Sequence, residues 1–172
     1  VLVYVGSKVG LATTPAWTAS GSQDNALFGM SVASAGDVNA DGYADVLTGA
    51  FWYDQSQNEQ GRAYPYLGVP WGVARTHSWP TTGIGMADLL GNVVAPVGNL
   101  NGDRFADFAV GVPLRDDPEI DEGAAWIFLG SAQGPALVPD WIAEADQADA
   151  QFGLGLAGAG DVNGDGADDL LV

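Results

Sequence analysis

Cysteine, basic residues and long apolar runs are what this sequence of 172 residues most clearly lacks. It has no Cys and one His, and its five Lys and Arg stand against 22 Asp and Glu, which gives a formal net charge of −17. The absence of Cys excludes disulfides, thiolate metal ligands and cysteine nucleophiles. So few basic residues cannot form the patch that nucleic acid or an anionic membrane surface requires. No run of 18 apolar residues is present, so we expect no membrane insertion.

Long helices are also excluded, because 25 Gly and 9 Pro interrupt the chain too often. Apolar residues nevertheless make up 47% of the sequence, which is enough for a folded core in spite of the charge. The composition therefore predicts a folded, all-β protein.

The main positive feature is an internal repeat of 62 residues that runs through the chain without an insertion. When residues 28–48 are aligned with residues 152–172, 12 of 21 positions are identical. Chance does not explain this agreement, and a repeat of this kind determines the fold. The same interval separates three tryptophans, which predicts a shared packing position: Trp17, Trp79 and Trp141.

Each period reads as four short strands separated by turn residues. In the first full period we expect strands within 28–35, at 45–48, over 62–67 and around Trp79. Four strands per repeat predict a β-propeller blade of four antiparallel strands, although the familiar blade repeats have about 40 to 50 residues. A parallel β-solenoid is the competing repeat fold, but its rungs are shorter and it does not need an acidic loop in every period.

The phase of the repeat predicts about three blade equivalents in the segment 1–172. Residues 1–27 match the third and fourth strands of one blade, 28–89 and 90–151 are full blades, and 152–172 supply the first and second strands of another. A closed ring needs about four to eight blades. We therefore expect the blades to be completed by sequence missing from this chain, which we favour, or by another copy of the chain in a ring or a stacked assembly. The start at Val1 rather than Met fits a mature, trimmed or partial chain.

The sharpest motif is an acidic loop of nine residues that occurs once per period, at 37–45, 99–107 and 161–169. Side-chain oxygens at positions 1, 3 and 5, a backbone carbonyl at position 7 and a carboxylate at position 9 can surround one hard cation. The predicted ligands are Asp37, Asn39, Asp41, Tyr43 and Asp45 in the first loop, Asn99, Asn101, Asp103, Phe105 and Asp107 in the second, and Asp161, Asn163, Asp165, Ala167 and Asp169 in the third.

Calcium is the cation that these loops favour. It accepts six to eight oxygens in flexible geometry, whereas magnesium demands a tight octahedron and zinc prefers nitrogen or sulfur. An EF-hand is excluded, because its twelfth position is a bidentate Glu before a helix and here that position holds Thr48, Val110 or Val172. A metal-free turn rich in Asp, Asn and Gly would explain one such loop. It does not easily explain three copies in register, so we expect about three calcium ions.

The three sites are not expected to be equal. At their predicted ligand positions the first and third loops carry three carboxylates each, and both have Gly at position 6, where a left-handed turn is expected. The middle loop carries two carboxylates and has Arg104 at position 6. A left-handed conformation at Arg104 would cost roughly 1 kcal/mol, and its charge would repel the ion. The middle site is therefore predicted to be the weakest.

These residues resemble the FG-GAP repeat, the blade of the integrin α-subunit β-propeller. The resemblance is carried in every period by the Phe-Gly pair, the acidic loop and the Gly-Ala pair, which in the first period are Phe28-Gly29, 36–45 and Gly49-Ala50. In that family the calcium loop joins strands 1 and 2 on the lower face, and ligands commonly meet the loops of the upper face. The departures are Leu90 for Phe, Val112 for Ala and the Arg104 loop.

The resemblance implies an extracellular or cell-surface, calcium-stabilised, non-catalytic module for recognition or adhesion, with a protein or glycan ligand on the upper-face loops. The alternatives are a lectin-like carbohydrate-binding propeller and an accessory propeller of a secreted enzyme. An exposed aromatic pair, Trp52 and Tyr53, is a candidate for ligand stacking, with core packing as the competing interpretation.

No catalytic site is predicted. His77 aligns with proline in the other periods and is expected to be an exposed loop residue without a catalytic partner. The acidic run 116–122, which ends with Glu122, is expected to be solvated rather than a pair of facing glycosidase carboxylates.

Overall fold

The computed structural model describes residues 1–77 and 80–172, and within them it contains strands and turns but no helix. In this part of the chain there is accordingly no helix that could cross a membrane. The all-β fold class predicted from the repeat is confirmed. One predicted strand position, Trp79, lies outside the described residues.

Two antiparallel sheets have four strands each, and their strands recur at the interval of the sequence repeat. The first runs in the order β10-β7-β6-β5 and the second in the order β14-β13-β12-β11. The strands of the first sheet are β5 (Val32–Gly36), β6 (Asp45–Ala50), β7 (Arg62–Tyr66) and β10 (Thr81–Thr82). Those of the second are β11 (Val94–Gly98), β12 (Asp107–Val112), β13 (Ala124–Phe128) and β14 (Trp141–Glu144).

Two further sheets have only two strands each. At one end β1 (Leu2–Val3) pairs with β4 (Trp17–Thr18), and at the other β15 (Ala157–Gly160) pairs with β16 (Asp169–Leu171). Their registers repeat those of the complete sheets. Leu2 pairs with Thr18 as Trp126 pairs with Ile142, two periods later.

Two hairpins were not predicted from the sequence. They are formed by β2 (Gly6–Ser7) with β3 (Gly10–Leu11) and by β8 (Gly68–Val69) with β9 (Gly72–Val73), and they too are 62 residues apart. Gly10 and Gly72 adopt φ values of 120° and 132°, which favour glycine and allow the tight turns.

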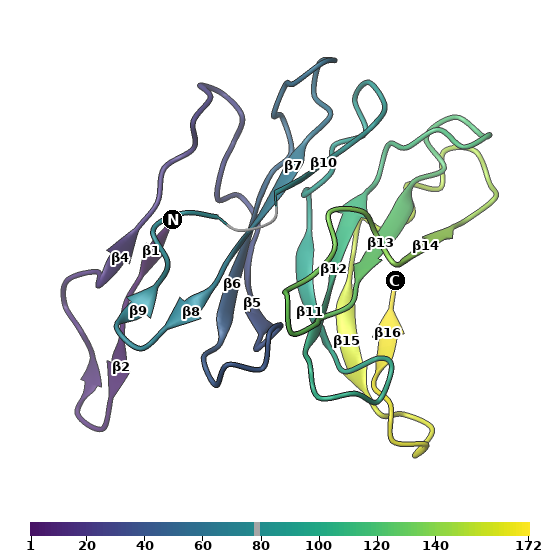
Figure 1. The fold of residues 1–172 in the computed structure, drawn as a ribbon. Coiled ribbons are helices and arrows are strands. Elements are labelled where there is room, and N and C mark those ends of the chain that lie inside the picture. The colour runs from purple at the N-terminus through teal and green to yellow at the C-terminus, as the bar shows by residue number, and fades with distance from the viewer. Residues whose placement is uncertain (78–79) are drawn as a thin grey trace.

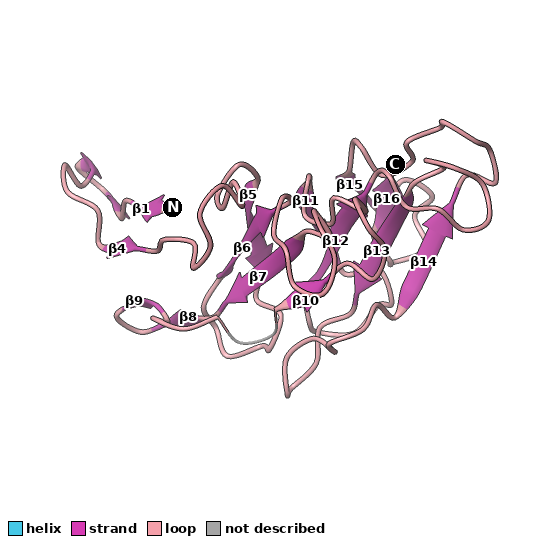
Figure 2. Cartoon of the chain, turned by 90° about the horizontal axis from the view of Figure 1, so that it is seen from above, coloured by secondary structure: helices cyan, strands magenta, loops and turns pink. Residues whose placement is uncertain are grey.

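The sheets follow one another in chain order, from the β1–β4 pair at one end of the molecule to the β15–β16 pair at the other (Figures 1 and 2). The first strand of each period lies on the inside, where β5 packs against β11 and β11 against β15. An inner row of first strands is the arrangement expected for neighbouring propeller blades.

Adjacent sheets touch through both side chains and backbone. The main core joins the two complete sheets and includes Leu47, Leu90 and Val110 together with Phe108, whose ring stacks on Phe128 at 5.1 Å between centroids. Nearby, a Cβ atom at Gly49 would overlap the carbonyl oxygen of Gly91 in the next sheet. Glycine is required at this position because the two backbones meet there without room for a side chain.

Candidate metal centres

The three acidic loops lie along the same edge of the molecule, the lower edge in Figure 1, where they join β5 to β6, β11 to β12 and β15 to β16. Each loop is preceded by a β-bulge that ends on a glycine with positive φ, at Gly36, Gly98 and Gly160. A glycine bulge turns the chain out of the ladder. The loop therefore projects from the sheet and returns at the aspartate that begins the next strand.

The aspartate at position 9 holds the loop to its sheet through hydrogen bonds. Asp45 is buried, and its carboxylate accepts hydrogen bonds from the backbone N–H groups of Val38, at 2.8 Å, and Gly68, at 2.7 Å. Asp107 accepts equivalent bonds at 2.8 Å from Leu100 and Gly130. Each buried carboxylate thus links its own loop to the turn after the third strand of its sheet.

Burial raises the pKa of Asp45 to about 6, against the lowering effect of the two N–H groups, and the charges of Asp41 and Asp37 raise it further. Burial raises the pKa of Asp107 in the same way. An anionic group that is held in a poorly solvated site near other anions is stabilised by a cation. The poor solvation of Asp45 and the nearby charges of Asp41 and Asp37 are the electrostatic reason to expect a positive ion beside the first loop.

Positions 1, 3 and 5 fold the first loop around their own oxygens. Asp37 accepts hydrogen bonds from the N–H groups of Asp41, at 3.0 Å, and Gly42, at 2.8 Å. Asn39 and Asp41 each accept one from the residue two positions on, Asp41 and Tyr43. Gly42 has a φ of 93°, so the left-handed turn predicted at position 6 is confirmed.

The third loop repeats this pattern. Asp161 accepts hydrogen bonds from Gly164, at 2.6 Å, and Gly166, at 2.9 Å, and Gly166 has a φ of 95°. The N–H group of Gly166 and its neighbours lower the pKa of Asp161. The remaining bonds also match those of the first loop, since Asn163 accepts from Asp165 and Asp165 from Ala167.

The middle loop differs at its first residue. Asn99 uses its side-chain Nδ2 to donate to the carbonyl of Asp103, and its Oδ1 is buried without a hydrogen-bond partner in the part of the chain that the structure describes. Asn101 and Asp103 keep the pattern of the other loops by accepting from Asp103 and Phe105. The orphaned oxygen of Asn99 lies at the place where the other loops have a carboxylate that accepts N–H groups of its own loop.

The conformation predicted for Arg104 is wrong. Arg104 is absent from the residues with positive φ, and in all three loops it is position 4 that is left-handed: Ala40 at 55°, Gly102 at 72° and Gly164 at 78°. The middle loop, like the other two, runs from a bulge glycine to the aspartate at position 9, but it does so without a left-handed turn at position 6. The guanidinium of Arg104 lies over the ring of Phe105, 5.0 Å from its centroid.

Across residues 1–77 and 80–172, no group of three or more His, Cys, Asp or Glu side chains is arranged so that it could hold a metal ion. In the first loop the carboxylates of positions 5 and 9 accept hydrogen bonds from within the sheet and the loop. The Oδ1 of Asp41 accepts from Tyr43 and its Oδ2 from the side chain of Asn39, while the carboxylate of Asp45 is bound to two N–H groups. The donor set consists of oxygens alone, which fits calcium chemically.

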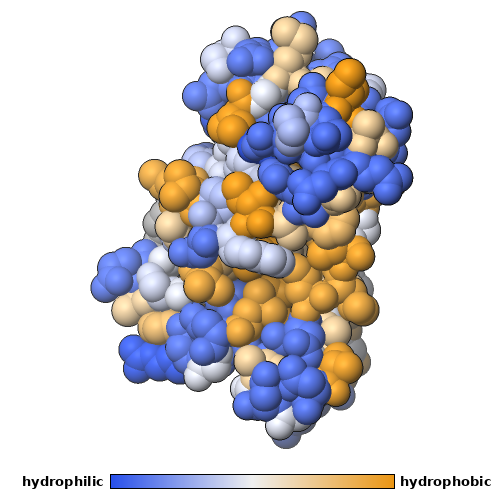
Figure 3. All heavy atoms as spheres, turned by 90° about the vertical axis from the view of Figure 1, so that its right-hand side faces the viewer, coloured by the Kyte–Doolittle hydropathy of each residue, from blue (hydrophilic) through white to orange (hydrophobic). Residues whose placement is uncertain are grey.

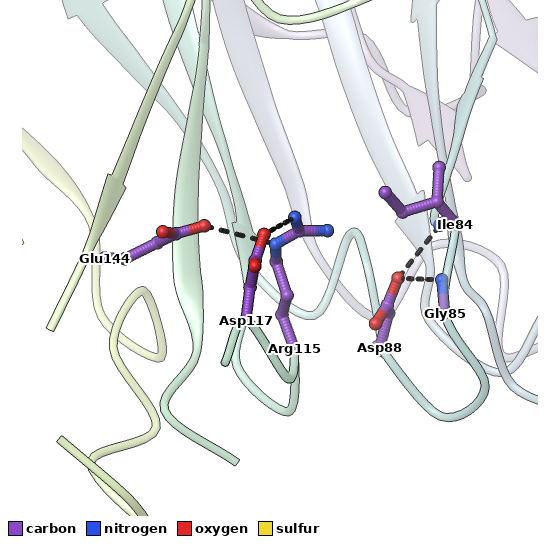
Figure 4. Close-up of polar contacts among 6 residues, drawn as sticks. All are labelled: Ile84, Gly85, Asp88, Arg115, Asp117 and Glu144. Carbon is purple, nitrogen blue, oxygen red and sulfur yellow. Dashed lines mark hydrogen bonds and ion pairs between the residues drawn. The ribbon is translucent and has the colours of Figure 1, made fainter. Parts of the chain in front are cut away.

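The opposite edge carries a second polar group (Figure 4). The largely buried guanidinium of Arg115 pairs with Asp117 and, at 3.2 Å, with Glu144, and Asp88 accepts from the N–H groups of Ile84 and Gly85. A cleft of about 380 Å³ lies between the loop that carries Asp88 and the loop that carries Arg115. It is lined by Ile84, Gly85, Met86, Asp88, Arg115, Asp116 and Asp117. It lies between the two complete sheets.

The acidic run 116–122 is not solvated throughout, as the sequence had suggested. Asp116 and Asp117 are exposed, but Glu122 is fully buried and neither of its carboxylate oxygens has a regular hydrogen-bond partner among the described residues. Glu122 aligns with Gln60, which is also buried, and both precede a glycine with positive φ.

The two residues predicted to stack on a ligand differ in their surroundings. Tyr53 packs edge-on against Tyr64, with ring centroids 6.4 Å apart, and the guanidinium of Arg62 covers its ring at 4.0 Å. Trp52 is 43% exposed and contacts the ring of Phe51. Of the two rings, that of Trp52 is the more available for a ligand.

Known proteins show the same repeat. The FG-GAP repeat family matches residues 28–64. Integrin alpha-PS2 of Drosophila melanogaster is 32% identical over 186 residues, an alignment that covers 97% of this chain and 13% of the relative. Integrin alpha-IIb of Mus musculus is 36% identical over 161 residues, or 88% of this chain and 15% of the relative. Integrin alpha-7 of Homo sapiens is 36% identical over 159 residues, or 89% and 12%.

The chain carries FG-GAP repeats. The four-stranded antiparallel sheets of this FG-GAP chain are therefore blades of the integrin-like β-propeller type. These relatives are integrin α chains, so the similarity to integrin α subunits that the sequence indicated is confirmed. This chain spans only 12% to 15% of the length of these three relatives.

Proposed function

We propose that this FG-GAP chain is a non-catalytic recognition module whose blades are stabilised by calcium at the three acidic loops. The observation that carries the proposal is the recurrence, in register, of a loop of oxygen donors that ends on a position-9 carboxylate, which is buried in the first two loops. Asp45 and Asp107 each hold their loop to a turn of the same sheet. A cation bound above them would neutralise repulsion within the loop and fix the connection between strands 1 and 2.

The proposed ligands are the side-chain oxygens at positions 1, 3, 5 and 9 and the backbone carbonyls of Tyr43, Phe105 and Ala167 at position 7. Calcium would bring a positive charge to the loops, and their oxygens would form part of its coordination shell of six to eight oxygens. The loop side chains that accept hydrogen bonds from N–H groups would also direct an oxygen toward the ion.

Calcium binding is tested by isothermal titration and by thermal unfolding with calcium or with a chelator. We expect half-saturation at about 10⁻⁴ to 10⁻³ M, as in other extracellular calcium modules, and a lower melting temperature after chelation. A melting temperature that does not respond to calcium or to the chelator would remove the calcium proposal.

The middle site is proposed to be the weakest, since its loop has one carboxylate fewer and a cationic side chain at position 6. The variant Arg104→Gly is expected to tighten that site by about tenfold at most, because one surface charge near the ion contributes on the order of 1 kcal/mol. Lys8→Gly, which removes a positive charge from the β2–β3 turn, is the matched control. Three sites of equal affinity in the unchanged chain would contradict the ranking.

A catalytic role finds no support around the single histidine. The His77 ring lies edge-on to Tyr64, at 5.2 Å, and to Tyr66, at 6.1 Å. Burial, with the nearby charge of Arg62, lowers its pKa. His77 is an exposed loop residue, and its ring borders two tyrosines without a catalytic partner among these contacts.

Recognition is proposed for the edge opposite the acidic loops, where the cleft between the complete sheets brings the Arg115 group beside the exposed Ile84 and Met86. A protein ligand fits this mixture of charge and apolar surface. A glycan ligand is the second candidate, favoured by the exposed ring of Trp52. A glycan array with the unchanged chain and with Trp52→Ala separates them, because only a glycan binder gives a signal that the variant loses.

A further inference from the structure

The acidic loops of neighbouring sheets are joined by hydrogen bonds. At both contacts between neighbouring loops, the N–H group at position 8 of one loop donates to the carbonyl at position 1 of the loop before it. Ala106 donates to Asp37 at 3.1 Å, and Asp168 donates to Asn99 at 2.9 Å. Figure 3, in which the side with β14 to β16 faces the viewer, shows hydrophilic side chains gathered at the lower end of the molecule, below the apolar surface of the sheets. A residue in one loop can therefore act on the loop before it.

The side chain at position 8 lies against the bulge glycine that begins the preceding loop. A Cβ atom at Gly36 would overlap the Cβ atom of Ala106, and a Cβ atom at Gly98 would overlap the carboxylate of Asp168. The two contacts thus have the same geometry, and in both the glycine leaves room for the residue at position 8. They differ in chemistry, because one brings a methyl group to the preceding loop and the other brings a negative charge.

Asp168 uses its carboxylate as well as its backbone in this contact. Its Oδ2 atom accepts a hydrogen bond at 2.8 Å from the N–H group of Asn99, and its own N–H group donates to the Asn99 carbonyl. A hydrogen bond to an ionised carboxylate is stronger than one between neutral groups. Both backbone groups of Asn99 are therefore held by one residue of the next sheet. Ala106 has no side-chain acceptor, so it can hold Asp37 only through the carbonyl.

Asn99 is the residue at which the middle loop departs from the other two. Asp37 and Asp161, at the same position, accept hydrogen bonds from N–H groups of their own loops. Asn99 instead donates to the carbonyl of Asp103, and its Oδ1 is buried without a hydrogen-bond partner among the described residues. The middle loop thus lacks both the charge and the internal hydrogen bonds of an aspartate at position 1. The carboxylate of Asp168 is bound at this residue.

We propose that Asp168 is a positioning residue of the middle calcium site, which holds Asn99 in place and supplies the negative charge that this loop lacks at position 1. The inference rests on the proposed binding of calcium by the acidic loops. Asp168 is not counted as a ligand, because its Oδ2 is bound to an N–H group. With Asp103 and Asp107, it brings the carboxylates that act on the middle ion to three, the number that the other loops have at their ligand positions.

The charge of Asp168 acts against that of Arg104, which lies at position 6 of the middle loop. A single charge close to an ion in a partly solvated site changes its dissociation constant by about tenfold. Removing the acid should therefore weaken the middle site, whereas removing the base should tighten it. The middle site remains the weakest of the three, but it is less weak than its own loop residues alone would make it.

Alanine at position 8 is compatible with this loop fold, because Ala44 and Ala106 occupy that position in the first and middle loops. The side chains at positions 3 and 5 make the same hydrogen bonds in all three loops. The variant Asp168→Ala therefore removes the carboxylate without requiring a new loop conformation. It also keeps the N–H group that donates to Asn99.

Calcium titration followed by amide NMR tests the assignment, because each loop contains a glycine of its own. Gly42, Gly102 and Gly166 report on the first, middle and third loops. In Asp168→Ala we expect the dissociation constant at Gly102 to rise about tenfold, that at Gly42 to stay unchanged and that at Gly166 to change by less than about threefold. Asp24→Ala, which removes an exposed acid from the loop between β4 and β5, is the control and should change none of them.

The outcomes separate this inference from the calcium proposal itself. A dissociation constant at Gly102 that is unchanged in Asp168→Ala, or that rises less than the one at Gly166, would overturn the role of Asp168. Calcium binding at the loops would still stand in that case, because the glycine amides respond to the ion. If none of the three amides responded to calcium in the unchanged chain, the calcium proposal would fail and this inference with it.

Two further variants test the carboxylate in both directions. Asp168→Asn keeps a side-chain acceptor for the Asn99 N–H group but has no charge, so it should recover part of the affinity that Asp168→Ala loses. Ala106→Asp places a carboxylate against Gly36, in the geometry that Asp168 has against Gly98, and should tighten the first site by about threefold. A first site that is unchanged or weaker in Ala106→Asp would show that a carboxylate at position 8 does not assist the loop before it.

Discussion

The two complete sheets share one backbone register but differ in the side chains and hydrogen bonds at aligned positions. Gln60, before the third strand of the first sheet, accepts hydrogen bonds at 3.0 Å from Ser56 and Gln57 and donates one at 3.0 Å to the Gly83 carbonyl. Glu122 occupies the same position in the second sheet, fully buried and without regular partners in the described chain. The residue that aligns with Ser56 is Pro118, which has no N–H to donate.

The repeat thus determines where a side chain is buried, but not whether its polar atoms find hydrogen-bond partners there. A carboxylate at position 122 cannot donate to a carbonyl as the Gln60 amide does. Burial raises the pKa of Glu122, the N–H of Asp117 opposes this, and the charges of Glu144, Glu119 and Asp146 add to it. The second sheet therefore holds an uncompensated acid where the first has a satisfied amide.

The largest difference between the sheets is expected in their cores. Phe108 is buried in a stack with Phe128, whereas the equivalent of Phe108 in the first sheet is the half-buried Val46. Phe108→Ala should lower the free energy of unfolding by about 3–5 kcal/mol, and Val46→Ala by about 1 kcal/mol. Urea unfolding of both variants measures this. Equal losses would mean that the cores around Phe108 and Val46 are equally well packed.

The Glu122 position is expected to give a difference that depends on pH. With a folded pKa above its ordinary 4.5, Glu122 keeps its proton longer in the folded chain, so stability falls as pH rises through the window between the two values. Glu122→Gln should remove this fall, and its gain in stability should be larger at neutral pH than at about pH 4.

Gln60→Glu is the reciprocal variant and should introduce the same fall in the first sheet. Asp45 and Asp107 titrate in every variant, so the comparison between variants isolates position 122. Unfolding free energies measured from about pH 4 to pH 8 decide the matter. If Glu122→Gln and the unchanged chain had parallel pH profiles, the buried acid would be excluded as their source.

A smaller effect is expected where Arg115 in the second sheet aligns with Tyr53 in the first. Arg115→Met leaves Glu144 and Asp117 without their cation and should cost about 2 kcal/mol, less than a fully buried pair because Asp117 is half exposed. Tyr53→Phe, the control in the first sheet, should cost less than about 0.5 kcal/mol. Thermal unfolding compares the two, and a cost for Arg115→Met no greater than that of the control would exclude a structural ion pair.

The smallest effect separates the acidic loops at position 4. Ala40 is left-handed there, while the other two loops have glycine. Ala40→Gly should stabilise the chain by about 0.5–1 kcal/mol because it relieves that conformation. Gly102→Ala should do the reverse in the middle loop. A loss of stability in Ala40→Gly, measured by thermal unfolding without calcium, would mean that the alanine side chain packs favourably.

The sequence repeat predicted the strand positions well, because glycines and aspartates recur wherever the backbone bends. It placed the third strand at 62–67, and the structure has it at Arg62–Tyr66. The environment of Glu122 was not predictable in the same way, since its burial depends on contacts with the following period. The prediction for Arg104 failed for a local reason. All three loops have a left-handed residue at position 4, and the middle loop, with Gly102 there, has no second one at position 6.

The close contact between Gly49 and the Gly91 carbonyl has a consequence for how these blades can diverge. Backbone touches backbone at this point, so the wedge angle between neighbouring blades depends on atoms that every amino acid shares, provided that the glycine is kept. The sequences of the outer loops can then change without altering how neighbouring blades pack. Such a fold can present different binding surfaces on one unchanged arrangement of blades.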